Sequence, residues 1–275
     1  MKKYPIILSI AGSDSSGGAG IQADIKTISA LGAYAATAIT AITVQNTTGV
    51  TAIHPIPPSY VEGQIDAVMK DLSPEAVKIG MINDIQITRV IVKTLKKYQP
   101  SFVVFDPVMV STSGSKLIED NALQVITEEL MPLTHLITPN ISEAEVLLNR
   151  NIGDLEQMKT AAKELLSFGS QAVLIKGGHL TGKSMDDVLQ LNSQSTPFIF
   201  SELHIESQNV HGTGCTLSSA IATFLALGYE MHQAVEKAKK YVTGAIEAGK
   251  DVRTGHGSGP LNHFYAPVPM KIVEA

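Results

Sequence analysis

The chain's single cysteine lies in the run His211-Gly212-Thr213-Gly214-Cys215-Thr216-Leu217, where the apolar spacing predicts the start of a helix. Its two glycines let a ligand approach the backbone closely, and the N–H groups of a first helical turn converge on an anion. The positive end of the helix dipole is expected to lower the pKa of Cys215 toward the thiolate. The run therefore predicts an anion hole with a reactive thiol. The simpler interpretation is a small core cysteine after a tight turn.

A second group of residues could bind a cation and phosphates. Asp106 ends an apolar run, and Asn140 and Glu143 lie three residues apart after another. Such oxygen ligands suit Mg²⁺, which usually binds one or two carboxylates, waters and substrate phosphates. Lys176 follows a predicted strand and precedes Gly177-Gly178, where its ammonium can reach a phosphate. The alternatives are a loop-capping Asp, a Glu that favours the helix dipole and a solvated lysine.

A third group could hold a small ring. Ser15-Ser16-Gly17-Gly18-Ala19-Gly20 is a flexible turn before a predicted helix, suited to close substrate approach. It lacks the Gly-x-Gly-x-x-Gly spacing of a dinucleotide fingerprint. Gln45, at the end of a predicted strand, presents a donor and an acceptor together, which matches an aminopyrimidine edge as an amide matches adenine. Taken alone, it is more often a turn residue.

The segment 177–184 satisfies the Walker A pattern letter for letter. A true P-loop needs a helix directly after its Lys-Ser pair, so that the helix dipole lies under the phosphates. Here Lys183-Ser184 leads into a short apolar run with no further helical turn. The match is therefore interpreted as accidental.

The elements that must position these residues alternate along the chain. Apolar runs predict strands over 6–11, 36–44, 50–56, 76–79, 101–105, 135–138 and 171–175. The sequence from 187 to 204 also has the character of β-strands. Amphipathic spacing predicts helices over 20–31, 59–72, 85–98, 214–227 and 233–248. Ser142-Glu143-Ala144-Glu145 is expected to open a further helix as a capping box, with Ser142 at the N-cap.

This alternation predicts an α/β fold, in which a mostly parallel central sheet is covered by helices on both faces. No linker divides the chain, so we expect one domain over residues 1–275. In open sheets of this kind, ligands bind outside the carboxyl ends of the strands. The residues singled out above gather at such ends, and this shared placement is stronger evidence for a site than any single residue.

Composition limits the class of protein. The 275 residues carry 21 Lys+Arg against 26 Asp+Glu, a net charge of −5, with no basic run beyond a lysine pair. This balance argues against nucleic acid and anionic membrane as partners. One cysteine forbids an intrachain disulfide and favours a reducing compartment, so a cytoplasmic protein is expected. The apolar run after Lys2-Lys3 is expected to be a buried strand rather than an export signal.

Several of these motifs occur together in one known family. The run 10–24, Ile-Ala-Gly-Ser-Asp-Ser-Ser-Gly-Gly-Ala-Gly-Ile-Gln-Ala-Asp, resembles the opening of the hydroxymethylpyrimidine/phosphomethylpyrimidine kinases of thiamine biosynthesis. Further matches follow in order: Val44-Gln45-Asn46-Thr47, Lys78-Ile79-Gly80-Met81, Asp106-Pro107-Val108-Met109, Thr138-Pro139-Asn140, Lys176-Gly177-Gly178-His179 and His211-Gly212-Thr213-Gly214-Cys215-Thr216. The resemblance covers essentially the whole chain, without a departure at the motif positions.

The resemblance implies a ribokinase-like three-layer α/β sandwich and an enzyme that uses ATP and Mg²⁺. It implies phosphorylation of 4-amino-5-hydroxymethyl-2-methylpyrimidine and then of its monophosphate, in one pocket. A homodimer is a further expectation from the family.

The resemblance also implies roles for individual residues. Gln45 would hold the pyrimidine edge, with four residues around the ring: Gly12, Asp24, Val44 and Met81. The anion hole would be formed by Gly212, Thr213 and Gly214, and Cys215 stands where ribokinase-like relatives place a catalytic Asp. As a thiolate, Cys215 could accept the hydroxymethyl proton. Lys176, Asn140 and Thr213 would face the nucleotide phosphates, and Asp106 and Glu143 would bind the metal.

Three other functions compete. Pyridoxal kinases resemble this chain closely, and pyridoxal shares the ring and hydroxymethyl group. A thiol hydrolase or acyltransferase could use Cys215 if a histidine, such as His179 or His211, lay beside it with an orienting acid. A non-catalytic pyrimidine sensor would keep Gln45 but has no need of Asp106, Glu143, Lys176 and Cys215 together.

The two lysines of the Gly-rich region give a test of the nucleotide site. Lys183→Ala should change kcat/KM less than about threefold and stability by under ~0.5 kcal/mol, since an exposed connection is expected there. Lys176→Ala should lose several kcal/mol of transition-state stabilisation, as phosphate-clamping groups commonly do. Steady-state kinetics of both variants decide between them. A dead Lys183→Ala enzyme beside a healthy Lys176→Ala enzyme would restore the P-loop interpretation.

Overall fold

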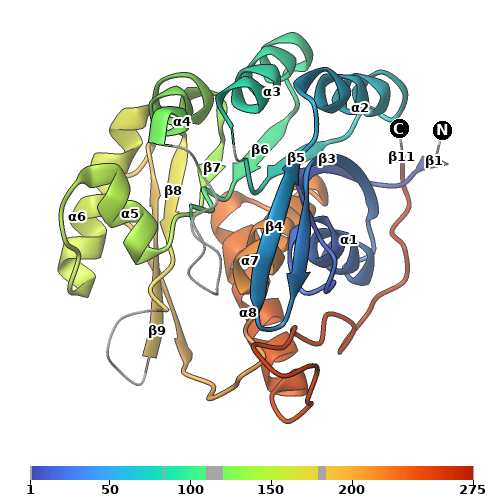
Figure 1. Cartoon of the computed structure of the whole chain (residues 1–275). Coiled ribbons are helices and arrows are strands. Elements are labelled where there is room, and N and C mark those ends of the chain that lie inside the picture. Colours follow the sequence, from blue (N-terminus) through green and yellow to red (C-terminus); the bar gives the residue numbers. More distant parts are fainter. Residues whose placement is uncertain (1, 83, 110–119, 179–183, 275) are drawn as a thin grey trace.

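The computed structural model describes residues 2–82, 84–109, 120–178 and 184–274. Its main feature is a nine-stranded sheet in the order β10-β9-β8-β7-β6-β5-β2-β3-β4, with helices on both faces (Figure 1). This is the three-layer α/β arrangement that the alternating sequence pattern predicts, and the mostly parallel sheet is confirmed.

The middle of the sheet is parallel and its edges are antiparallel. The parallel strands are β2 (Ile6–Asp14), β3 (Tyr34–Asn46), β5 (Ala76–Ile79), β6 (Phe102–Phe105), β7 (Leu136–Ile137) and β8 (Ala172–Ile175). Antiparallel strands extend the two edges: β4 (Gly49–Pro55) beside β3, then β9 (Ser184–Leu191) and β10 (Phe198–Leu203) beyond β8. A small separate sheet joins the two ends of the chain through β1 (Lys2–Lys3) and β11 (Val273–Glu274).

Two helical layers cover the sheet. One consists of α2 (Pro58–Asp71), α3 (Ile85–Tyr98), α5 (Ile141–Leu148) and α6 (Leu155–Leu165), with the short α4 (Asp120–Val125), η1 (Ile126–Leu130), η2 (Met131–Leu133) and η3 (Leu166–Phe168). The other consists of α1 (Gly20–Ala30), α7 (Thr213–Ala226) and α8 (Met231–Gly249). Side chains alternate between these layers along each strand, because neighbouring strand residues point to opposite faces. On β2, Leu8 and Ile10 pack in the first core and Ile7 in the second.

Strand β2 is the point at which the sheet changes direction. The chain passes from β2 to β3 on one side, and the next parallel strand, β5, pairs with β2 on the other side. Such a switch point opens a crevice at the carboxyl ends of the strands, because the crossovers on its two sides diverge. The fold therefore provides a site at the edge where the chemistry-bearing residues were expected.

One local prediction is wrong. Helix α5 begins at Ile141, so Asn140 rather than Ser142 is its N-cap. Asn140 Oδ1 accepts from the Glu143 N–H, and Glu143 Oε2 accepts from the Asn140 N–H, each at 2.8 Å. Ser142 is exposed, and Glu145 instead accepts from the Ile152 N–H beyond the helix. Both registers contain a capping pair three residues apart, and the point where β7 ends selects between them.

A fully buried ion pair joins the sheet to the second helical layer. Lys78 Nζ on β5 lies 3.0 and 2.9 Å from the two carboxylate oxygens of Asp24 on α1, and neither side chain is exposed. Ser9 on β2 and Ser219 on α7 donate their hydroxyls to the same carboxylate. Burial lowers the pKa of Lys78, but the nearby negative charges, led by that of Asp24, together outweigh it and hold the pKa above its ordinary value. Lys78 is therefore a buried cation that depends on Asp24.

No helix among the described residues is both long enough and apolar enough to cross a membrane.

Removing one member of the buried pair should destabilise the fold severely. Asp24→Ala leaves the Lys78 ammonium without a counter-charge, and such a change costs about 3–5 kcal/mol of unfolding free energy. Replacing both residues, as Asp24→Leu with Lys78→Met, should recover much of this loss, since it removes both charges. Urea unfolding measures the stability of the unaltered chain and of both variants. Glu236→Ala, on the exposed Glu236–Lys240 pair of α8, is the control, and it should change the unfolding free energy little. Equal effects of Asp24→Ala and Glu236→Ala would contradict the assignment.

Candidate active site

A cavity of about 880 Å³ lies at the carboxyl edge of the sheet. It brings together residues that follow or end β2, β3, β5, β6, β7 and β8, and the first turn of α7. Its described lining includes most of the residues singled out from the sequence: Gly12, Gln45, Met81, Asp106, Asn140, Glu143, Lys176, Gly212, Thr213, Gly214 and Cys215. Residues spread over two hundred positions thus form one site, because parallel strands end at the same edge.

The N-terminus of α7 is positioned by two glycine-dependent contacts. Gly212 is the N-cap, in the left-handed region at φ 84°, and a Cβ there would overlap the Gly18 carbonyl. A Cβ on Gly214 would lie 3.2 Å from Asp106 Oδ2 and 3.3 Å from Lys176 Nζ. The backbone of this turn therefore closely approaches both the glycine-rich loop and the charged residues.

The anion hole differs in one detail from the prediction. The N–H of Thr213 donates to the Val210 carbonyl at 3.3 Å, so it is engaged within the protein. Gly214 and Cys215 occupy the rest of the first turn, whose N–H groups have no carbonyl partner inside the helix. Thr213 can still contribute its hydroxyl, which belongs to a residue that lines the cavity.

The expected thiolate at Cys215 is wrong. Burial, together with the Asp24 and Asp106 charges, raises the pKa of Cys215 to about 11. The Lys78 charge and a hydrogen bond from the Gly20 backbone N–H offset part of this effect. Cys215 as a residue is half-buried and lines the cavity, but its surroundings disfavour a negative charge. Cys215 is therefore a neutral thiol near pH 7, and desolvation outweighs the helix dipole.

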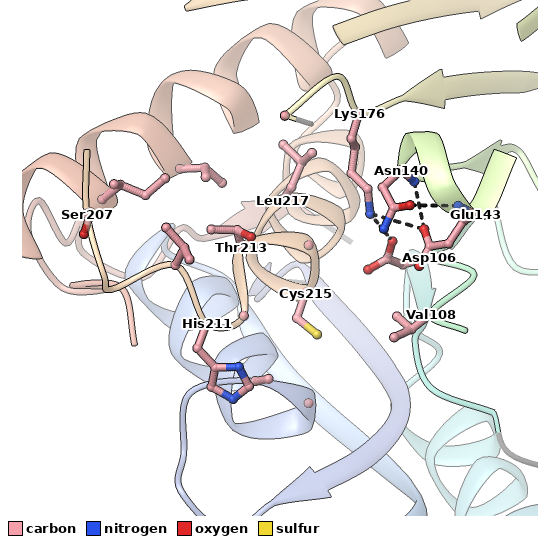
Figure 2. A pocket seen from close by; sticks show the side chains of 18 of the residues that line it. Asp106, Val108, Asn140, Glu143, Lys176, Ser207, His211, Thr213, Cys215 and Leu217 are labelled. Carbon is pink, nitrogen blue, oxygen red and sulfur yellow. Dashed lines mark hydrogen bonds and ion pairs between the residues drawn. The ribbon is translucent and has the colours of Figure 1, made fainter. Parts of the chain in front are cut away.

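The charged residues meet beside the first turn of α7, where Figure 2 shows Lys176 above Asp106 and Glu143. Lys176 Nζ lies 2.7 Å from Asp106 Oδ1 and 4.0 Å from Glu143 Oε2. Burial and the Asp106 charge raise the pKa of Glu143 to about 7, against the opposing charge of Lys176. Asp106 Oδ1 also accepts from the Thr138 hydroxyl at 3.0 Å.

This cluster fits a hard cation. Asp106 Oδ2 is buried and has no hydrogen-bond partner, and two buried carboxylates share one lysine. Within the part of the chain that the structure describes, no group of three or more His, Cys, Asp or Glu residues is placed to hold a metal ion. Waters and substrate phosphates would complete the coordination shell of a cation here, which is the usual arrangement for Mg²⁺.

Two predicted ring-binding residues lie elsewhere. Asp24 and Val44 are not among the described residues that line the cavity. The Asp24 carboxylate accepts hydrogen bonds from Lys78, Ser9 and Ser219, so its role is structural. Val44 is 59% exposed, because strand alternation turns its side chain away from the face that carries Gln45.

The glycine-rich region 177–184 is followed by a strand. Ser184 begins β9, so the helix that a P-loop requires is absent from the described residues after position 183. Lys183 and His179 lie outside the described residues. The N–H of Gly177 instead donates to Asp187 Oδ1 at 2.9 Å, and Asp187 Oδ2 pairs with Lys239 Nζ at 2.7 Å. No local sequence pattern links residues on β9 and α8, so only the fold reveals this Asp187–Lys239 pair.

Asp14 and His211 form a further long-range pair, which joins the end of β2 to the segment before α7. Asp14 Oδ2 lies 2.9 Å from His211 Nε2, and Asp14 accepts from the backbone N–H groups of Ser16, Gly18 and Ala19. Burial raises the pKa of Asp14, but the hydrogen bonds, led by that to His211, hold it below its ordinary range. The only local signal was the position of each residue, beside the glycine-rich turn and before the anion hole.

Comparison with known proteins shows where this fold and site recur. The phosphomethylpyrimidine kinase family model matches residues 14–262. The chain is 47% identical over 261 residues to a hydroxymethylpyrimidine/phosphomethylpyrimidine kinase of Rhizobium meliloti, covering 94% of this chain and 97% of that protein. It is 46% identical over 260 residues to a thiamine biosynthesis bifunctional protein of Geobacter sulfurreducens, covering 94% of this chain. It spans 52% of that longer relative, about half its length.

Two solved structures are similar throughout. The phosphomethylpyrimidine kinase of Clostridium difficile 630 superposes with a TM-score of 0.78 at 46% identity, covering 88% of this chain and 99% of that one. An ADP complex of Bacillus subtilis pyridoxal kinase superposes with a TM-score of 0.87 at 34% sequence identity, covering 95% of this chain and 98% of that one. The fold is therefore that of a ribokinase-like kinase. Within that class, the chain belongs to the phosphomethylpyrimidine kinase family, as its motifs indicated.

The protonation state of Cys215 can be measured by alkylation. Iodoacetamide should react more slowly with the folded chain at pH 7 than with the urea-unfolded chain, whose thiol has an ordinary pKa. Because thiolate is the nucleophile, the folded rate should rise about tenfold per pH unit until the pH approaches the pKa of about 11. Cys215 is the chain's one thiol, so the signal is unambiguous. A folded rate that levels off near neutral pH would contradict the raised pKa.

Proposed function

We propose that this protein uses ATP to phosphorylate 4-amino-5-hydroxymethyl-2-methylpyrimidine and then its monophosphate, as its family membership suggests. One observation carries the proposal: a single cavity holds an amide suited to the pyrimidine edge and a cationic, metal-compatible phosphate end. Gln45 and Met81 line this cavity together with Lys176 and the first turn of α7, and Figure 2 shows Lys176 near that turn. The ring and the transferring phosphate therefore share one enclosed site.

The phosphate end stabilises charge. Phosphoryl transfer depends mainly on positioning and on neutralising the oxygens of the transferring group. The ammonium of Lys176 and the N–H groups of Gly214 and Cys215 supply positive potential there. Mg²⁺ bound by Asp106 and Glu143, beside the amide of Asn140, would supply further neutralisation of the phosphate charge.

The hydroxymethyl end needs orientation more than deprotonation. The hydroxymethyl oxygen forms a bond to the γ-phosphorus as the bond to the ADP oxygen breaks, and the hydroxyl proton is released to solvent water. In a loose transition state that proton is lost late, so a neutral Cys215 orients the hydroxyl without first removing its proton. In the second reaction the nucleophile is already an anionic phosphate. The same site therefore serves both steps without a thiolate.

Pyridoxal kinase is the second candidate. The observation that favours it is the TM-score of 0.87 with the Bacillus subtilis enzyme. Pyridoxal shares the ring and hydroxymethyl group, so the same cavity could admit both substrates. A thiol hydrolase is disfavoured, because the raised pKa of Cys215 leaves no nucleophilic thiolate near neutral pH.

A homodimer and a cytoplasmic location complete the proposal. Both are expectations from the family and from the single cysteine. Ile42 and Val44 are 47% and 59% exposed on β3, beside the edge strand β4, and such apolar surface is consistent with a covered face.

The substrate is tested by ATP consumption with the pyrimidine, with pyridoxal and with neither. We expect turnover with the pyrimidine. Gln45→Ala should raise its KM by about 5- to 150-fold, since a lost bidentate contact costs about 1–3 kcal/mol, with little change in KM for ATP. Gln171→Ala, at an exposed glutamine before β8, is the matched control. Turnover with pyridoxal alone would favour the second candidate, and a raised ATP KM would move Gln45 to the nucleotide site.

A further inference from the structure

The amide of Gln45 is held between two side chains. Its Nε2 lies 3.1 Å from His211 Nε2, and its Oε1 accepts from the Thr43 hydroxyl at 3.0 Å. The same His211 nitrogen lies 2.9 Å from Asp14 Oδ2. The Thr43 hydroxyl also lies 2.9 Å from the Ser13 carbonyl. Because the oxygen and nitrogen of an amide exchange places when it turns over, these partners decide which way Gln45 points.

The position of the proton on His211 decides between the two orientations of the Gln45 amide. Asp14 is ionised near pH 7, since its hydrogen bonds stabilise the carboxylate, and a carboxylate only accepts. His211 Nε2 must therefore carry hydrogen toward Asp14. An N–H cannot accept from an amide NH₂, so the Gln45 oxygen belongs on the His211 side. Turned this way, the amide NH₂ donates to Thr43 Oγ1, whose own hydrogen goes to the Ser13 carbonyl.

This orientation sets the direction in which an aminopyrimidine binds. The ring nitrogen accepts from the amide NH₂ and the exocyclic amine donates to the amide oxygen. With the oxygen beside His211, the amine lies on the His211 side of the ring. The hydroxymethyl group is attached next to the amine, on the side away from that ring nitrogen. It is therefore directed past His211, toward Gly212 and Cys215.

We propose that His211, held by Asp14, is a positioning residue that fixes the Gln45 amide and so directs the hydroxymethyl group toward the anion hole. The proposal rests on the pyrimidine kinase function. With the amide reversed, the same ring would bind equally well but would present its hydroxymethyl group toward Thr43. His211 and Asp14 are 7% and 3% exposed, so the pair is shielded from competing water.

The test compares four enzymes: the unaltered chain, His211→Asn, Gln45→Ala and the double variant. Asn is too short to reach both Asp14 and Gln45, so His211→Asn should lower kcat with the pyrimidine about tenfold or more. The dissociation constant of the pyrimidine, measured by calorimetry, should change less than about threefold, since the ring can bind in either direction. Once Gln45 is gone, removing His211 should add less than about threefold, because it acts through the amide.

Three further variants keep the result interpretable. His211→Gln restores an NH₂ group at similar reach and should keep kcat within about threefold of the unaltered chain. Thr43→Val removes the partner at the other end of the amide, leaves His211 in place and should also lower kcat only when Gln45 is present. His256→Asn, at an exposed histidine, controls for the substitution itself.

Additive losses in the double variant would overturn the proposal, because they would mean that His211 acts on the anion hole independently of Gln45. Equal activity of His211→Asn and the unaltered chain would also overturn it. Either result leaves the kinase function intact if the unaltered chain phosphorylates the pyrimidine. Absence of that turnover would instead reject the proposed function.

Discussion

The buried ion pair between Lys78 and Asp24 is the contact on which the geometry of the site depends. It joins β5 to α1, and through the Ser9 and Ser219 hydroxyls it also ties in β2 and α7. The first turn of α7 carries Cys215, so this pair fixes the anion hole relative to the end of β2. A charge buried without its partner is strongly unfavourable, and the arrangement is therefore kept as a unit.

The same buried charges explain the chemistry of the thiol. Lys78 stabilises a thiolate at Cys215, but Asp24 and Asp106 oppose it and burial removes solvation. An ion pair that is neutral overall gives little net field, so desolvation decides the outcome. The chain thus keeps an anion hole beside an uncharged sulfur, which suits a reaction in which negative phosphate must approach. A thiolate at this position would repel the transferring group.

The two ends of the cavity are linked through the backbone between His211 and Gly212. His211 contacts the amide of Gln45 and the carboxylate of Asp14, while Gly212 packs against the glycine-rich loop and caps α7. Asp14 organises that loop through three backbone N–H groups. Substrate orientation and the phosphate site therefore share one set of contacts. This sharing explains why glycine is required at 212, where any side chain would separate the loop from the helix.

Local patterns were enough to predict the α/β class, the mostly parallel sheet and the sheet edge that carries the site residues, Gln45, Asp106, Lys176 and Cys215. Hydrophobic period is a local property, and parallel strands end together, so these features follow from short-range pattern. The remaining features depend on contacts between residues far apart in the chain. Asp24 pairs with a lysine 54 positions away, and Asp14 with a histidine 197 positions away. Local spacing favoured Ser142 as the N-cap of α5, but the helix begins earlier and Asn140 is the cap. Local spacing also favoured a thiolate at Cys215, but burial raises the pKa of the thiol. Desolvation and pairing depend on neighbours brought together only by the fold, and no local pattern records them.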